Sequence, residues 1–138
     1  MNIKKILLPA LLVGIVCGII SEFTYCCGLH LLEGFVAVVL LFFITNREKP
    51  TLFDSLICGA LTGLADGIAG GLTSAILILL NFPLEPEVTG MQQGMSATEF
   101  WSLWFFASII VAVVFAAISA VEGLIAGFLL GQLRDRKN

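Results

Sequence analysis

Four carboxylic acids lie inside otherwise apolar stretches of this 138-residue chain: Glu22, Glu33, Asp66 and Glu122. No Lys or Arg shares a stretch with any of them. An acid at the centre of a bilayer costs about 2.5–3.5 kcal/mol, so an acid retained there is a candidate functional group. Several acids held close together must share protons, bind a cation or contact a water-filled cavity. If these stretches cross a membrane, the four acids predict a cation- or proton-binding site.

The acids are expected at a similar depth in the membrane. We measured depth along each stretch from the basic or capping residue at its inner end, at about 1.5 Å per residue. Each acid then lies about 18–25 Å from that inner end. A residue next to a glycine is turned by about 100° from it around a helix, which places it at the edge of a close helix contact. Three of the acids have such a neighbour, in the pairs Glu33-Gly34, Asp66-Gly67 and Glu122-Gly123. We therefore expect these acids to face a groove between helices.

A second interpretation of the same acids is structural. Protonated acids can hydrogen-bond to backbone carbonyls or to the hydroxyls of Ser21, Thr62 and Ser119, and such bonds hold helices together in lipid. Glu22 can also reach water at the outer surface. Both interpretations stay open at the level of the sequence.

Cys26, Cys27 and His30 form a weaker candidate site, for a soft metal ion or for redox chemistry. The chain has four cysteines and one histidine, without a CxxC motif or the second Cys/His pair that a closed metal site needs. A packed turn is the simpler explanation of this group. Cys17 and Cys58 lie in apolar stretches and are expected to pack as small hydrophobic residues.

The composition predicts an all-α integral membrane protein with a single domain, residues 1–138. Hydrophobic residues make up 59% of the chain and charged residues 12%, which excludes the water-soluble classes. About 20 apolar residues cross the roughly 30 Å hydrocarbon core of a bilayer. We expect four transmembrane helices over about 6–25, 29–45, 51–81 and 106–133, with an outer loop over 82–97 and an interfacial helix start over 98–105.

Two capping boxes mark predicted helix starts. Thr51 is followed three residues later by Asp54, an aspartate version of the capping box. Ser96 and Glu99 have the same spacing, and two Trp residues follow them at a position typical of the headgroup boundary.

The basic residues indicate the orientation in the membrane. All seven flank the inner ends of the predicted spans, at Lys4, Lys5, Arg47, Lys49, Arg134, Arg136 and Lys137. Because Lys and Arg near span ends are retained in the cytoplasm, we expect both termini inside, in the cytoplasmic membrane of a prokaryote. The division of the cations among three short flanks argues against a nucleic-acid partner.

Glycines recur at every fourth residue in three of the predicted spans. Small residues let helix backbones approach closely in lipid, so these stripes predict a glycine-rich bundle, with any surplus glycine faces joining subunits. The stripes are Gly14 and Gly18, then Gly59, Gly63, Gly67 and Gly71, and then Gly123, Gly127 and Gly131. The segment Leu32-Glu33-Gly34-Phe35 also parallels Val121-Glu122-Gly123-Leu124, the pattern of a two-hairpin parallel repeat.

Glycine-rich helices that carry Glu33 and Glu122 resemble the duplicated proteolipid of rotary ATPases. The resemblance covers only the surroundings of these two acids and the glycine stripes. That family has its hairpin turns in the cytoplasm, whereas the basic residues here place the turns outside. Size and span count are similar to those of small multidrug transporters, whose critical Glu lies in the first span.

Taken together, the sequence predicts a small polytopic membrane protein that binds or translocates a cation or proton through Glu22, Glu33, Asp66 and Glu122, as a homo-oligomer. The alternative is a non-catalytic accessory subunit of a larger membrane complex, docked through the glycine stripes. We expect no enzyme activity and no cofactor, because no nucleophile–base pair and no phosphate-binding loop is visible.

Overall fold

A computed structural model describes residues 3–24, 30–45, 50–80 and 94–135 of the chain. Within these ranges it is all-helical, with no strand. Its helices are α1 (Ile3–Thr24), α2 (Glu33–Ile44), α3 (Leu52–Leu79) and α5 (Ala97–Asp135).

Three of these helices are long and apolar enough to cross a membrane. The qualifying segments are Ile3–Phe23 of α1, Leu52–Leu79 of α3 and Ala97–Leu133 of α5. At about 1.5 Å per residue each exceeds the roughly 30 Å of the hydrocarbon core. These helices are consistent with the membrane protein that the composition predicts.

Helix α2 is shorter than the span predicted over 29–45. It has 12 residues, which extend about 18 Å and fall short of the roughly 30 Å core. His30 to Leu32 form a turn that precedes it. A fourth membrane span therefore stays a prediction.

The other helices follow the apolar stretches closely. Helix α5 is continuous from Ala97 to Asp135, so the predicted interfacial start over 98–105 and the span over 106–133 are one helix. The predicted turn at 26–28 and most of the predicted outer loop over 82–97 lie outside the described residues.

Both predicted capping boxes are confirmed. At the start of α3, the Asp54 N–H donates to Thr51 Oγ1 at 3.0 Å and the Thr51 N–H donates to Asp54 Oδ2 at 3.3 Å. At the start of α5, the Ser96 N–H donates to Glu99 Oε2 at 3.0 Å, and the Glu99 N–H donates to Ser96 Oγ at 3.4 Å. Each box satisfies N–H groups that have no partner inside the helix.

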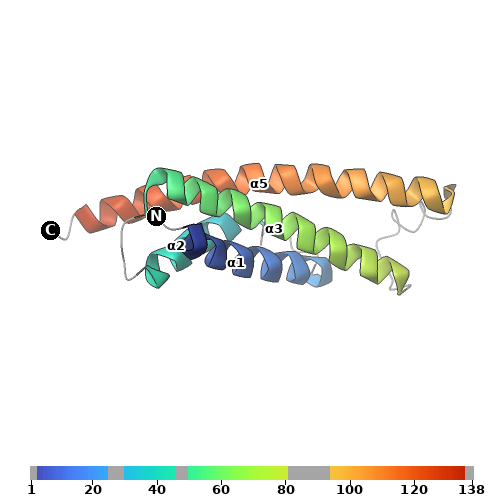
Figure 1. Cartoon of the computed structure of the whole chain (residues 1–138), viewed down its shortest axis with the longest axis horizontal. Coiled ribbons are helices and arrows are strands. Elements are labelled where there is room, and N and C mark those ends of the chain that lie inside the picture. Colours follow the sequence, from blue (N-terminus) through green and yellow to red (C-terminus); the bar gives the residue numbers. More distant parts are fainter. Residues whose placement is uncertain (1–2, 25–29, 46–49, 81–93, 136–138) are drawn as a thin grey trace.

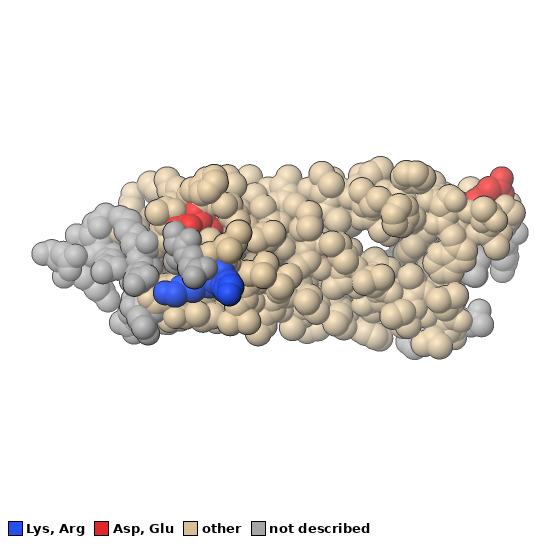
Figure 2. Space-filling model, in the orientation of Figure 1, with Lys and Arg blue, Asp and Glu red and all other residues tan. Residues whose placement is uncertain are grey.

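Helix α3 lies between α1 and α5, which do not contact each other, while α2 contacts all three. The first turn of α1 and the last turn of α5 lie toward the same end of the elongated bundle (Figure 1). Figure 2 shows one face, on which a patch of Lys and Arg lies near that end with a patch of Asp and Glu beside it, while most of the surface is uncharged. The cytoplasmic location of this end stays a prediction.

The glycine stripes lie where helix backbones nearly touch. A Cβ added to Gly14 would stand 2.3 Å from the Thr62 carbonyl oxygen, across the contact of α1 with α3. One added to Gly59 would stand 2.1 Å from the Ser119 carbonyl oxygen, across the contact of α3 with α5. A side chain there would force the backbones apart, so close packing in this chain requires glycine at these positions.

The remaining stripe glycines also face helices of the same chain. Added Cβ atoms would lie within 2.6 Å of a neighbouring atom at Gly18, Gly63, Gly67, Gly123 and Gly127, and at 3.2 Å from Ser108 at Gly71. Gly131 is buried. The stripes therefore join the helices of one chain.

Candidate functional site

The turn before α2 and the start of α2 bring an imidazole and a carboxylate against a carboxylate of α3, in the middle of the bundle. One ligand atom each from His30, Glu33 and Asp66 lies within 4.8 Å of the others. Glu33 and Asp66 are each only 1% exposed, while the His30 side chain is 18% exposed. We call these three residues the acid–imidazole cluster.

Asp66 contributes an acid with no hydrogen bond. His30 Nδ1 lies 2.8 Å from Asp66 Oδ2, which is an ion-pair contact when the imidazole is protonated. Apart from this contact, both Asp66 oxygens and the His30 Nδ1 atom lack a hydrogen-bond partner among the described residues. A buried polar group without a partner costs about 1–3 kcal/mol, and more when it is charged. The cluster is thus complete only with a proton or an ion between these atoms.

The imidazole of His30 is held by an aromatic contact. It stacks on Phe115 of α5, with ring centres 4.3 Å apart and planes inclined by 19°. The stack fixes the plane of the ring while its Nδ1 atom faces Asp66.

Glu33 is oriented by a hydroxyl of α5. Ser119 Oγ donates to Glu33 Oε1 at 2.5 Å, whereas the other oxygen, Oε2, is buried and has no partner among the described residues. The backbones also fit tightly here, because a Cβ on Gly34 would stand 2.2 Å from the Ser119 carbonyl oxygen. One Glu33 oxygen is thus fixed by the protein and the other is available.

Glu122 lies against the start of α2 instead of in the cluster. The Gly34 N–H donates to Glu122 Oε2 at 3.0 Å. The residue at the N-cap of α2, Leu32, makes no side-chain capping bond, so Glu122 satisfies an N–H that would otherwise be unpaired. A negative charge is also favourable at a helix N-terminus. Glu122 therefore caps α2 from α5.

Glu22 lies at the contact between α1 and α3. Ser74 Oγ donates to Glu22 Oε2, and Glu22 Oε1 is 3.3 Å from the place where a Cβ on Gly70 would be. Glu22 is half-buried and has a partner of its own.

The structure therefore brings together two of the four predicted acids, Glu33 and Asp66, and gives Glu22 and Glu122 other partners. Of the three hydroxyls predicted to bond acids, Ser119 does so. The Ser21 hydroxyl donates to the Gly18 carbonyl oxygen and the Thr62 hydroxyl to that of Cys58, each within its own helix.

His30 lies with the acids, whereas the sequence grouped it with Cys26 and Cys27, which lie outside the described residues. The available signal was the spacing His30-x-x-Glu33, because residues three apart share one face of a helical turn. Phe115, which positions the imidazole, carried no signal in the sequence.

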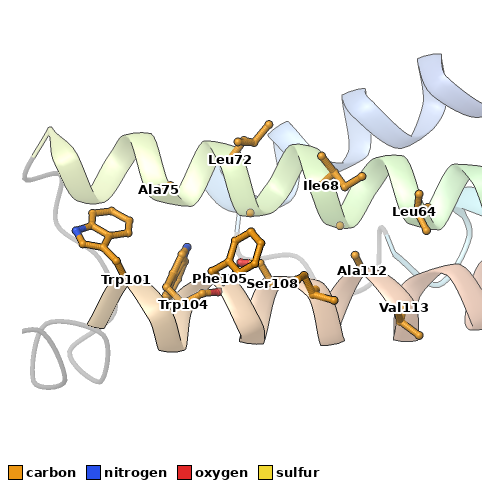
Figure 3. Close-up of a pocket in the computed structure, with 13 residues that line it drawn as sticks. Leu64, Ile68, Leu72, Ala75, Trp101, Trp104, Phe105, Ser108, Ala112 and Val113 are labelled. Atoms are coloured by element: carbon orange, nitrogen blue, oxygen red, sulfur yellow. Dashed lines mark hydrogen bonds between the residues drawn. The ribbon is translucent and has the colours of Figure 1, made fainter. Parts of the chain in front are cut away.

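A separate apolar groove of about 480 Å³ runs between α3 and the first half of α5. In Figure 3, Trp101, Trp104 and Phe105 project from α5 opposite Ile68 and Leu72 of α3. The Trp104 indole Nε1 is buried without a hydrogen-bond partner among the described residues. The groove can hold apolar groups but contains no carboxylate.

No protein-family model matches this chain, and neither the curated proteins nor the solved structures contain a match.

Proposed function

We propose that the protein is a small polytopic protein of the prokaryotic cytoplasmic membrane that binds or translocates a cation or proton through its intramembrane carboxylates. The observation that carries the proposal is the acid–imidazole cluster, with the Glu33, Asp66 and His30 ligand atoms within 4.8 Å of one another. Buried acids with free oxygens are rare in membrane helices and mark ion and proton pathways.

The position of the cluster supports a role in crossing the membrane. Asp66 lies about 21 Å along α3 from Leu52 and about 20 Å from Leu79. An ion held there is midway between the helix ends. His30 is the partly exposed member of the cluster, so an ion or proton would enter the cluster beside it.

Charge also supports the proposal. Neither Glu33 nor Asp66 is paired with a Lys or Arg among the described residues. Two ionised carboxylates this close repel one another, and a proton or a cation relieves the repulsion. A group that must be neutralised in this way binds and releases the neutralising species.

We propose a homo-oligomer because three spanning helices and the short α2 leave little room for a pathway inside one chain. The outward faces of the helices, which make no contact within the chain, are apolar. These faces can pack against other subunits, and a pathway leading to His30 would form between them.

Flux through liposomes containing the purified protein tests the proposal. Asp66→Asn and Glu33→Gln keep the shape of each side chain and remove its charge, so each should abolish cation or proton flux. Glu99→Gln is the matched control, because Glu99 is exposed at the start of α5 and Gln also serves in a capping box. Flux that persists in both cluster variants, with folding intact, would contradict the proposal.

The alternative function, an accessory subunit of a larger membrane complex, is favoured by the apolar groove. The glycine stripes proposed as its docking surface are occupied by helices of the same chain, whereas the groove between α3 and α5 is open. If the alternative holds, affinity purification from native membranes should recover one defined protein, and Gly71→Leu, which fills the groove, should release it. If Gly71→Leu releases the partner and liposome flux is unaltered in Asp66→Asn, the accessory-subunit function would replace the transport proposal.

A further inference from the structure

We infer that the acid–imidazole cluster binds a divalent first-row transition-metal ion, of the chemistry of Zn²⁺ or Fe²⁺, with His30, Glu33 and Asp66 as ligands. The inference rests on the proposed function, since it names the class of cation that the same site takes.

The ligand set selects this class of ion. Mg²⁺ and Ca²⁺ are bound by oxygen ligands, whereas an imidazole nitrogen suits Zn²⁺, Fe²⁺, Ni²⁺ and Cu²⁺. One His and two carboxylates combine the two kinds of ligand. Monovalent cations gain little from an imidazole, and they leave one of the two carboxylate charges uncompensated.

The distances suit such an ion. Ligand atoms bound to Zn²⁺ at about 2.0–2.1 Å stand about 3.3 Å apart in a tetrahedron. His30 Nδ1 and Asp66 Oδ2 are 2.8 Å apart, and all three ligand atoms lie within 4.8 Å. To enclose the ion, the Nδ1–Oδ2 pair would open by about 0.5 Å, and the widest pair of ligand atoms would close by about 1.5 Å at most.

The free atoms of the cluster are the ones that an ion needs. Both oxygens of Asp66, Glu33 Oε2 and His30 Nδ1 have no hydrogen-bond partner among the described residues, although Asp66 is almost completely buried. Each has a lone pair when the acids are ionised and the imidazole is neutral with its proton on Nε2. A dication then balances the two negative charges.

The supporting contacts are those expected around a metal site. The hydroxyl of Ser119 fixes the non-ligating oxygen of Glu33, and Phe115 fixes the plane of the imidazole. Hydrogen bonds behind the ligands orient them and increase metal affinity. Three protein ligands also leave a coordination position open, as in sites that exchange a ligand. An open position suits an ion that must leave the site again.

Metal binding to the purified full-length protein, without an affinity tag and in detergent micelles, tests the inference. Co²⁺ is the spectroscopic probe, and Zn²⁺ displacement of Co²⁺ gives the affinity. We expect one Co²⁺ per chain, with visible absorption bands of a nitrogen- and oxygen-ligated ion. Mg²⁺ should not displace it.

The His30→Gln variant tests the ligand that distinguishes this inference from general cation binding. Loss of a contact behind a metal ligand costs about 10–100-fold in affinity, so loss of a ligand should cost more than about 100-fold. Ser119→Ala should cost about 10–100-fold, because it leaves the ligands in place and removes only the support of Glu33. Glu99→Gln should bind the metal as the parent protein does.

The outcomes separate this inference from the proposed function. Liposome flux of protons or monovalent cations that depends on Asp66, without Co²⁺ or Zn²⁺ binding, would overturn the inference and keep the proposed function. Absence of both metal binding and flux would overturn both. Unchanged affinity in His30→Gln, or an intense sulfur-to-cobalt absorption band, would place the metal elsewhere and overturn the inference.

Discussion

At the scale of single residues, the four acids in the apolar stretches differ mainly in their hydrogen-bond partners. Glu22 and Glu33 each accept a hydrogen bond from a Ser of another helix, and Glu122 accepts one from a backbone N–H. Asp66 alone among these four accepts none from the described residues. Its nearest polar contact is the imidazole of His30 at 2.8 Å. Asp66 is therefore the acid whose state depends most on a bound proton or ion.

The bond from Ser119 to Glu33 should be measurable in stability. In Ser119→Ala, Glu33 loses its hydroxyl partner while remaining buried, so we expect a loss of about 1–3 kcal/mol in the free energy of unfolding. Ser108→Ala is the control on the same helix, because the Ser108 hydroxyl donates to the Trp104 carbonyl oxygen of α5 itself. Its effect should stay within about 0.5 kcal/mol. Denaturation in mixed micelles gives both values. Equal losses in the two variants would show that the bond from Ser119 to Glu33 does not stabilise the fold.

The sequence was sufficient to single out the acids, because charged side chains are conspicuous in apolar stretches. It was not sufficient to pair them. The contact of His30 with Asp66 depends on the position of α2 along the axis of α3. No local sequence pattern predicts that position. The role of Glu122 was missed for a related reason. Helix α2 begins after Leu32, which is not a capping residue, so nothing in the sequence marked the N-terminus that Glu122 caps.

At the scale of helices, close backbone contact positions the site. Helix α3 is the central element, with glycines toward α1 on one side and toward α5 on the other. Gly34 and Gly59 would both collide with the carbonyl oxygen of Ser119 if they carried a side chain. The same residue of α5 therefore anchors α2, α3 and the Glu33 carboxylate. The helices and the capping boxes were predictable from composition and spacing, whereas the reduced length of α2 was not.

Paired glycine substitutions test this packing. Gly59→Ala places a Cβ 2.1 Å from a backbone oxygen that cannot move alone, so we expect a net loss of about 1–3 kcal/mol in the free energy of unfolding. Gly71→Ala meets only the Ser108 side chain, at 3.2 Å, and gains up to about 1 kcal/mol of helix propensity. It should be near neutral. Equal destabilisation of the two variants, measured in mixed micelles, would contradict the close contact at Gly59.

At the scale of the whole molecule, three helices are of membrane-spanning length, and the start of α1 and the end of α5 lie toward one end of the bundle. The buried core of hydrophobic residues around Leu41 and Cys58 is small, and many large apolar side chains are exposed. Lipid or further subunits would cover them. Such a molecule is held together by close helix contact and a few polar bonds rather than by a large hydrophobic core.

The orientation can be tested by thiol labelling in intact cells. Leu52 lies at the basic end of the bundle and Met95 close to the start of α5 at the opposite end, and both are exposed. In a background without native cysteines, a membrane-impermeant thiol reagent should label Met95→Cys from outside. It should label Leu52→Cys only after the cells are opened, because the basic residues are retained inside. The reverse pattern would contradict the predicted orientation.

The most direct test of the central claim is an anomalous difference map, recorded at the zinc absorption edge, from crystals of the full-length protein grown with Zn²⁺. We predict one peak about 2.0–2.2 Å from a His30 nitrogen and from one carboxylate oxygen each of Glu33 and Asp66. A map without a peak between these residues, in crystals where His30 lies away from Asp66, would contradict the claim that they form one ion site.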